Sequence, residues 1–132
     1  QIHSRFEMIA IFCNHPDPRV ETFIHDCFNH YFDGRLKRHI DVDVVFKTHL
    51  RGDAAGYCTG DTDEILIELD NTYRGKELYR NIAHEIVHAK QFLRGEDGSI
   101  ELMEAEAMWY EDYLVKLYLK PRVHKCYTMY IE

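Results

Sequence analysis

The chain has 132 residues, of which 45% are hydrophobic and 13% aromatic. It is therefore long enough for one folded domain, residues 1–132, and too apolar for a disordered one. Sixteen Lys and Arg against 23 Asp and Glu give a net charge of −7, which argues against a nucleic-acid partner. No apolar run approaches the roughly 20 residues that span a bilayer, so we expect no membrane partner.

The four cysteines, Cys13, Cys27, Cys58 and Cys126, are widely and irregularly spaced and include no CxxC pair. This spacing favours reduced core cysteines over a disulfide framework. The N-terminal sequence also lacks the basic region, apolar stretch and cleavage site of a secretory signal. We therefore expect an intracellular, cytoplasmic protein.

In the N-terminal half, the sequence predicts a buried strand over residues 6–12, which is mostly apolar and rich in β-formers. A helix follows from Pro18 to about Phe32, with Asp17 as its N-cap. Its apolar residues recur at helical spacing along one face. A second strand is predicted over residues 41–49.

The C-terminal half begins with a predicted loop over residues 52–60, which contains three glycines. Residues 64–70 alternate between apolar and polar side chains, as in a strand with one polar face, and we place this strand at the sheet edge. Two helices follow, over residues 76–93 and 100–119, and Ser99 is the N-cap of the second. The order β-α-β-β-α-α predicts an α+β domain with a small mixed sheet.

The first of these two helices contains the sequence HEIVH, in which His84, Glu85 and His88 form an HExxH motif. Residues four apart share a helix face, so the two imidazoles are placed to bind one zinc ion. Zinc lowers the pKa of a bound water to about 7, and Glu85 is placed to take its proton as general base. The alternative is a helix whose histidines form hydrogen bonds and bind no metal.

A catalytic zinc site needs a third protein ligand. The extended HExxHxxGxxH pattern is excluded, because Gln91 and Arg94 stand where it requires Gly and His. The histidine that follows, His124, comes only after Pro121. The remaining candidates are the glutamates of the following helix, Glu101, Glu104, Glu106 and Glu111.

The angular positions of these glutamates around the helix axis, their helical phase, distinguish them. At about 100° per residue, seven apolar or aromatic side chains fall within roughly 80° of Glu106, whereas Glu104 falls on the opposite side. An ionised carboxylate in an apolar stripe is costly unless it is paired or bound to a metal. Glu106 is therefore the predicted ligand and Glu104 the alternative. Without metal, Glu106 would form an ion pair with Arg80 or Lys90.

Peptide hydrolysis also needs a donor that stabilises the oxyanion. The sequence offers Tyr110, Tyr113, Arg122, His124 and Tyr127. Tyr110, one turn after Glu106, is also placed to orient a histidine ligand, and packing is the alternative role of each tyrosine. Gln91 lies within about 20° of His84 in helical phase, so we expect it to line the site or orient a ligand.

The stretch HEIVHAKQ, followed by EAEAMWYEDYL on the next helix, resembles the gluzincin branch of zinc metallopeptidases. It looks most like ImmA/IrrE-type peptidases and small phage and bacterial SprT-like domains, over roughly residues 64–120. The resemblance implies a zincin-like fold and a phage or bacterial source. It also implies a third ligand at the glutamate before alanine, which maps to Glu106, although Glu104 fits the same two letters.

The resemblance further implies that the substrate binds as an extended strand along a sheet edge, and residues 64–70 are the candidate edge. Together these features predict a zinc-dependent peptidase that hydrolyses peptide bonds. One alternative has the same chemistry and acts on a non-peptide amide. Another is a zincin-like interaction domain whose metal is structural or absent.

Overall fold

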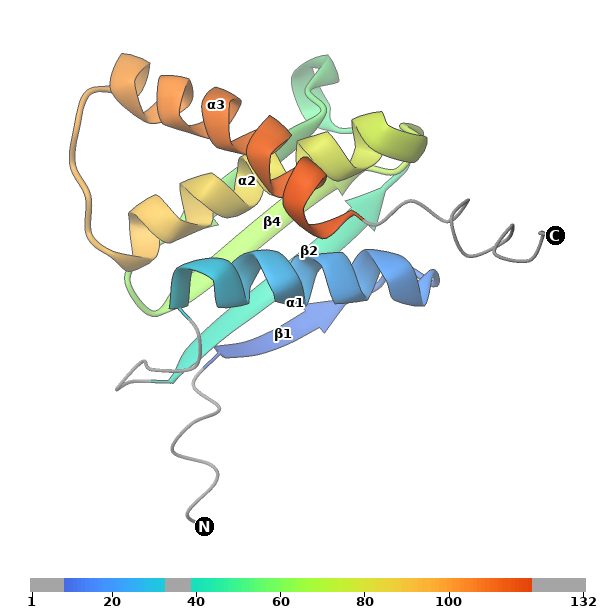
Figure 1. The fold of residues 1–132 in the computed structure, drawn as a ribbon, viewed down its shortest axis with the longest axis horizontal. Coiled ribbons are helices and arrows are strands. Elements are labelled where there is room, and N and C mark those ends of the chain that lie inside the picture. Colours follow the sequence, from blue (N-terminus) through green and yellow to red (C-terminus); the bar gives the residue numbers. More distant parts are fainter. Residues whose placement is uncertain (1–8, 33–38, 120–132) are drawn as a thin grey trace, which may run out of the picture.

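The computed structural model describes residues 9–32 and 39–119. Within them the fold is α+β, with one four-stranded mixed sheet and three α-helices (Figure 1). The elements are β1 (Ile9–Cys13), α1 (Pro18–Phe32), β2 (Ile40–Lys47), the 3₁₀ helix η2 (Arg51–Asp53), β3 (Gly56–Gly60), β4 (Glu64–Asp70), α2 (Gly75–Leu93) and α3 (Ile100–Tyr118).

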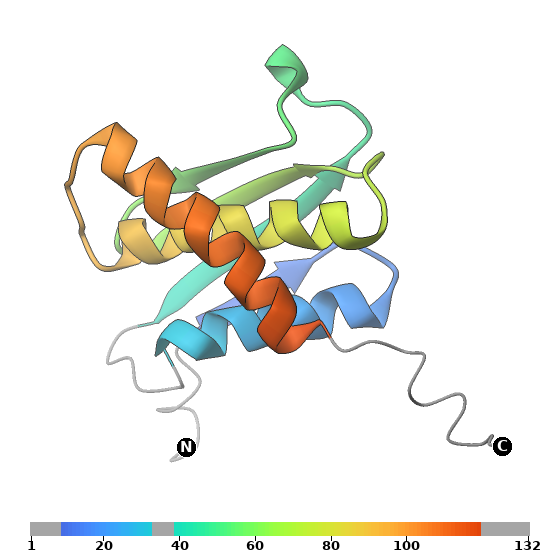
Figure 2. The ribbon, with the colours of Figure 1, turned by 45° about the horizontal axis from the view of Figure 1, so that its top comes forward.

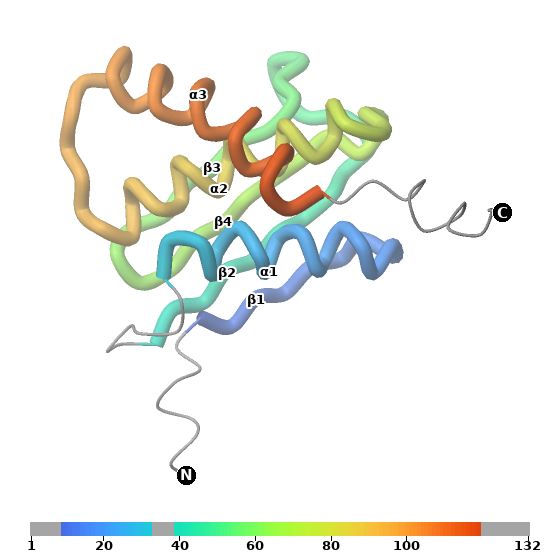
Figure 3. The backbone as a smooth tube through the Cα atoms, viewed as in Figure 1, coloured from blue at the N-terminus to red at the C-terminus, as the bar shows by residue number. Residues whose placement is uncertain are grey.

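The strands lie in the order β1-β2-β4-β3. The pairs β1–β2 and β2–β4 are parallel, and β3 pairs with β4 in the antiparallel direction. The chain can be followed through these crossovers in Figure 3. In the described part of the chain, β1 and β3 are therefore the two edges of the sheet.

One face of the sheet is covered by helices. In β2 the side chains of Ile40, Val42, Val44 and Phe46 are buried. The intervening Asp41 and Asp43 are exposed, so the other face is turned to solvent. Helices α1 and α2 lie side by side on the covered face, and α3 crosses over both of them (Figure 2). This arrangement buries α2 between the sheet and α3.

Several predicted elements are confirmed. Helix α1 begins at Pro18 and ends at Phe32, and Asp17 caps it by accepting a 2.9 Å hydrogen bond from the Arg19 N–H. The strand over residues 64–70 has the predicted bounds. Ser99 caps α3 and accepts a 3.2 Å hydrogen bond from the Leu102 N–H.

The prediction that residues 52–60 form a loop is wrong for their second half, because residues 56–60 form β3. A tight turn joins β3 to β4. In it, Asp61 accepts hydrogen bonds from the N–H groups of Asp63 at 2.8 Å and Glu64 at 3.0 Å. The glycines at both ends of the strand hid its β-prone centre, which is Tyr57, Cys58 and Thr59.

The edge position predicted for residues 64–70 is also wrong, because β4 pairs with β2 on one side and with β3 on the other. Its polar face misled the prediction. Glu68 on that face is buried because it forms ion pairs with Lys47 at 2.7 Å and Arg51 at 3.5 Å. A buried carboxylate is tolerated when cations compensate its charge.

Parts of two predictions fall outside the described residues, namely residues 6–8 of the first strand and the C-terminal segment from residue 120 on, which includes His124. Cys13, Cys27 and Cys58 are free thiols. None of the helices described here combines the length and the apolar character needed to cross a bilayer.

Candidate metal centre

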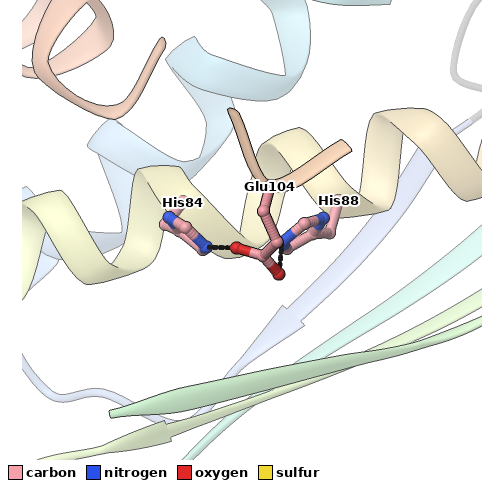
Figure 4. A group of neighbouring side chains, drawn as sticks. All are labelled: His84, His88 and Glu104. Carbon is pink, nitrogen blue, oxygen red and sulfur yellow. Dashed lines mark hydrogen bonds and ion pairs between the residues drawn. The ribbon is translucent and has the colours of Figure 1, made fainter. Parts of the chain in front are cut away.

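Helix α2 presents His84 and His88 one turn apart, with ring centroids 4.9 Å from each other. The side chain of Glu104 reaches down from the first half of α3 and lies between the two rings (Figure 4). Its Oε1 lies 3.1 Å from Nε2 of His84, and its Oε2 lies 3.1 Å from Nε2 of His88. The ligand atoms that the three side chains offer all lie within 4.8 Å of one another.

The second ring nitrogen of each histidine, Nδ1, lies close to a side-chain oxygen of another residue. Nδ1 of His84 lies 2.6 Å from Oε1 of Glu111, and Nδ1 of His88 lies 2.8 Å from Oε1 of Gln91. The Gln91 amide nitrogen already donates to the Met103 carbonyl at 3.1 Å. Both partners of Nδ1 are acceptors, so Nδ1 carries the proton in each ring. In the neutral rings, the Nε2 lone pairs therefore face Glu104.

This arrangement fits zinc. A neutral Nε2 and a carboxylate oxygen are both acceptors, so their close approach needs a cation between them or protonated rings. Zinc–ligand distances of about 2.0–2.2 Å in a tetrahedral site place ligand atoms roughly 3.4 Å apart. The two N···O distances of 3.1 Å are close to this separation. Two imidazoles and one carboxylate also form a donor set of catalytic zinc sites, in which the fourth position holds water.

Glu85 lies beside the histidines, and its side chain is buried. Burial raises the pKa of this carboxyl group, the two histidines oppose the rise, and the carboxylates of Glu104 and Glu111 add to it. Gly56 of β3 packs directly on it, because a Cβ at this position would lie 3.0 Å from Cγ and 3.1 Å from Oε2 of Glu85. The absence of a side chain at residue 56 therefore leaves room for Glu85.

The histidines open into a cleft of about 450 Å³ between β3 and the helix pair. The cleft is lined by Gly56, Tyr57, Cys58, His84, Glu85, His88, Gln91, Phe92, Glu96, Ile100, Met103 and Glu104. Among these described residues there are three carboxylates and no Lys or Arg. The local charge therefore favours a bound cation.

The predicted placement of Glu106 at the histidines is wrong. Its Oε2 accepts a 2.7 Å hydrogen bond from Lys90, and its Oε1 accepts a 2.8 Å hydrogen bond from Gln91. Burial raises the pKa of Glu106, but these two hydrogen bonds together with the charges of Lys90 and Arg94 outweigh it and hold the pKa below its usual value. The alternative role, an ion pair with Lys90, is thus the one that the structure supports.

The error came from the packing of α3. Several of the large apolar side chains near Glu106 in helical phase are exposed, among them Leu102 and Trp109. The face that packs on α2 carries Ala107 and Leu114, both fully buried. Because Ala107 is small, α3 comes close to α2, and Glu104 on the same face reaches the histidines.

Of the remaining predicted residues, Gln91 lines the cleft, and it contacts His88 rather than His84, to which helical phase had related it. Tyr110 does not line the cleft. Its ring contacts Trp109 at 4.6 Å and Tyr31 at 6.1 Å between centroids, which is the packing role. The structure does not describe His124, so its predicted role is untested.

Sequence reasoning missed the roles of Glu111 and Gly56. A signal for Glu111 was present, because it lies seven residues after Glu104, and residues seven apart share a helix face. No comparable signal pointed to Gly56, whose importance depends on the antiparallel pairing of β3 with β4.

No protein-family model matches this chain, and no curated protein matches it either.

Proposed function

We propose that the chain is a zinc-dependent peptidase with a zincin-like fold, in which His84, His88 and Glu104 hold the metal. The observation that carries this proposal is the Glu104 carboxylate, which meets two Nε2 atoms at 3.1 Å. The Nδ1 atoms of both rings face acceptors, which directs the Nε2 lone pairs toward a metal.

When bound, zinc supplies a Lewis acid and lowers the pKa of a water molecule to about 7. Glu85 would accept the proton of that water at its carboxylate as the oxygen attacks the peptide carbonyl carbon, and would pass the proton to the leaving amine as the C–N bond breaks. The Glu85 side chain is buried beside both histidines, which is the position that a general base for this water needs. Glu111 and Gln91 hold the rings in one orientation throughout.

The proposed substrate is an extended peptide segment that pairs with β3. This strand borders the cleft, and within the described residues it pairs with β4 alone. Its free edge presents backbone donors and acceptors to a ligand, as in β-strand addition. In this proposal β3 replaces residues 64–70 as the substrate-binding edge. The unpaired thiols support an intracellular setting, where cysteines stay reduced.

The test combines zinc content, measured by elemental analysis, with cleavage of a peptide library. We expect about one zinc per chain and cleavage by the parent protein. Glu85→Gln should keep zinc and lose cleavage, because the amide cannot accept the proton. Glu77→Gln, an exposed position on the same helix, is the matched control and should keep both properties.

Zinc binding without cleavage by the parent protein would contradict the peptidase proposal and favour an interaction domain with a structural metal. Absence of zinc from the purified protein, and no binding of added zinc, would contradict the metal centre itself.

A further inference from the structure

The surface of α3 that points away from α2 is unusually apolar. Among the described residues, six of the nine exposed large apolar side chains lie on this helix. They are Ile100, Leu102, Met108, Trp109, Tyr113 and Leu117. Three of them, Leu102, Trp109 and Tyr113, fall within about 40° in helical phase. With Ala105 they form what we call the outer face of α3. Contiguous exposed apolar surface of this kind marks interaction sites.

Trp109 is the centre of this face. It is 62% exposed, and its ring stacks on Tyr113 with an interplanar angle of 22° and a centroid distance of 5.6 Å. A shallow groove of about 610 Å³ follows the outer face and includes Ala105. Tryptophan and tyrosine are enriched among the residues that contribute most to the binding energy of protein interfaces.

Two charges flank the outer face, Glu101 near the start of α3 and Lys116 near its end. In the described part of the chain, neither side chain takes part in an ion pair, whereas Asp112 is paired with Arg80 at 2.8 Å. Glu101 and Lys116 are roughly 60° apart in helical phase, so they lie on the same flank of the face. A partner with an opposite charge at each end would complement them.

A second copy of the same chain meets these requirements when the two α3 helices lie antiparallel with Trp109 at the centre. Lys116 follows Trp109 by seven residues and Glu101 precedes it by eight, so each lysine comes level with the glutamate of the other copy. Tyr113 follows Trp109 by four residues and Ala105 precedes it by four. The large side chain of Tyr113 in one copy therefore comes level with the small side chain of Ala105 in the other. A parallel arrangement would instead bring each charge level with the like charge of the other copy.

We propose that the outer face of α3 is a self-association surface, through which two copies of this chain form an antiparallel, twofold-symmetric dimer. A twofold axis makes the contact self-complementary, as these pairings require. One helix pair buries less than the about 1,600 Å² of a standard interface. We therefore expect the association to be weak and reversible. The proposal does not depend on the metal centre.

Sedimentation velocity of the full chain over a range of concentrations tests the association. Trp109 is the sole tryptophan of the chain, so its fluorescence reports on the same contact. We expect a concentration-dependent monomer–dimer equilibrium and a blue shift of the emission as the dimer forms, with and without zinc. A monomer at all concentrations would overturn the proposal, as would emission that is blue-shifted and independent of concentration.

Charge reversal tests the antiparallel arrangement. Glu101→Lys and Lys116→Glu should each weaken association at least about tenfold, because like charges then meet at both ends. Mixing the two variants, or combining both changes in one chain, should restore it. If neither the mixture of the two variants nor the doubly changed chain regains association, the antiparallel geometry is overturned.

Leu102→Ser should abolish the dimer without affecting the fold, because its side chain is 70% exposed. Leu66→Ser is the matched control, since Leu66 is also exposed but lies on the sheet. Circular dichroism verifies that both variants fold. Association that survives Leu102→Ser, or that is lost with Leu66→Ser, would place the interface elsewhere.

Discussion

The face of α3 that packs on α2 carries small and acidic residues, whereas the face turned to solvent carries the largest apolar side chains of the helix. The inner face includes Glu104, Ala107 and Glu111, and the outer face includes Leu102 and Trp109. An ordinary surface helix has the reverse distribution. The inner face of α3 is thus arranged around the histidines of α2, and the core contacts of the helix are concentrated near Leu114 and Val115.

This difference explains how two glutamates in the same local sequence, Glu-Ala, come to have different roles. Glu104 lies at the Nε2 atoms of His84 and His88. Glu106, two residues later, is rotated toward Lys90, whose side chain is nearly inaccessible to solvent. We infer that one carboxylate serves the metal and the other compensates a buried cation.

Substitutions of Glu104 and Glu106 should differ most in their effect on zinc affinity. Glu104→Ala removes a proposed ligand and should lower the affinity by more than the roughly 10- to 100-fold typical of an outer partner. Glu106→Ala acts only through Gln91 and should stay within that range. Competition with a chromophoric zinc chelator measures both. A larger loss for Glu106→Ala would reverse the assignment, and Glu101→Ala on the same helix is the control.

The parts of the fold that local signals specify could be predicted from the sequence. Asp17 and Ser99 are N-caps with a clear position, and the alternation over residues 64–70 identifies a strand. The HExxH spacing places His84 and His88 on one face without any knowledge of the fold. These predictions depend on helix and strand periods, which the chain carries within a few residues.

The choice between Glu104 and Glu106 could not be made this way, because it depends on which side of α3 meets α2. Apolar content pointed to the wrong side, since the decisive feature is the close approach that Ala107 permits. Strand β3 was missed for a related reason. Its glycines indicate a turn locally, and pairing with β4 outweighs that preference.

A second test of the inner face concerns Glu111. Its Oε1 lies 2.6 Å from Nδ1 of His84, so Glu111→Ala should lower zinc affinity about 10- to 100-fold without changing the stoichiometry. Asp112→Ala removes the neighbouring carboxylate, which is paired with Arg80 at the surface, and should leave the affinity unchanged. Equal affinities for Glu111→Ala and the parent protein would show that the ring needs no such support.

Substitutions of the two glutamates should also differ in their effect on the free energy of unfolding. Glu106→Ala leaves Lys90 with Glu96 as its remaining ion-pair partner among the described residues, and it removes an acceptor from Gln91. We expect it to lower the free energy of unfolding by about 1–3 kcal/mol. Without metal, Glu104→Ala should change it by less than about 0.5 kcal/mol, since Glu104 is exposed. Urea unfolding in the presence of a chelator measures this, and equal effects would contradict the separate roles.

The smallest effect is expected on the outer face of α3. In the monomer, Leu102→Ser should change the free energy of unfolding by no more than about 0.5 kcal/mol, because solvent already surrounds this side chain. Leu114→Ala, on the inner face and fully buried, should cost about 2–5 kcal/mol through the cavity that it leaves. Urea unfolding below the concentration of association separates folding from self-association. A large loss for Leu102→Ser under these conditions would mean that the outer face is part of the monomer core, and the contrast between the two faces of α3 would no longer hold.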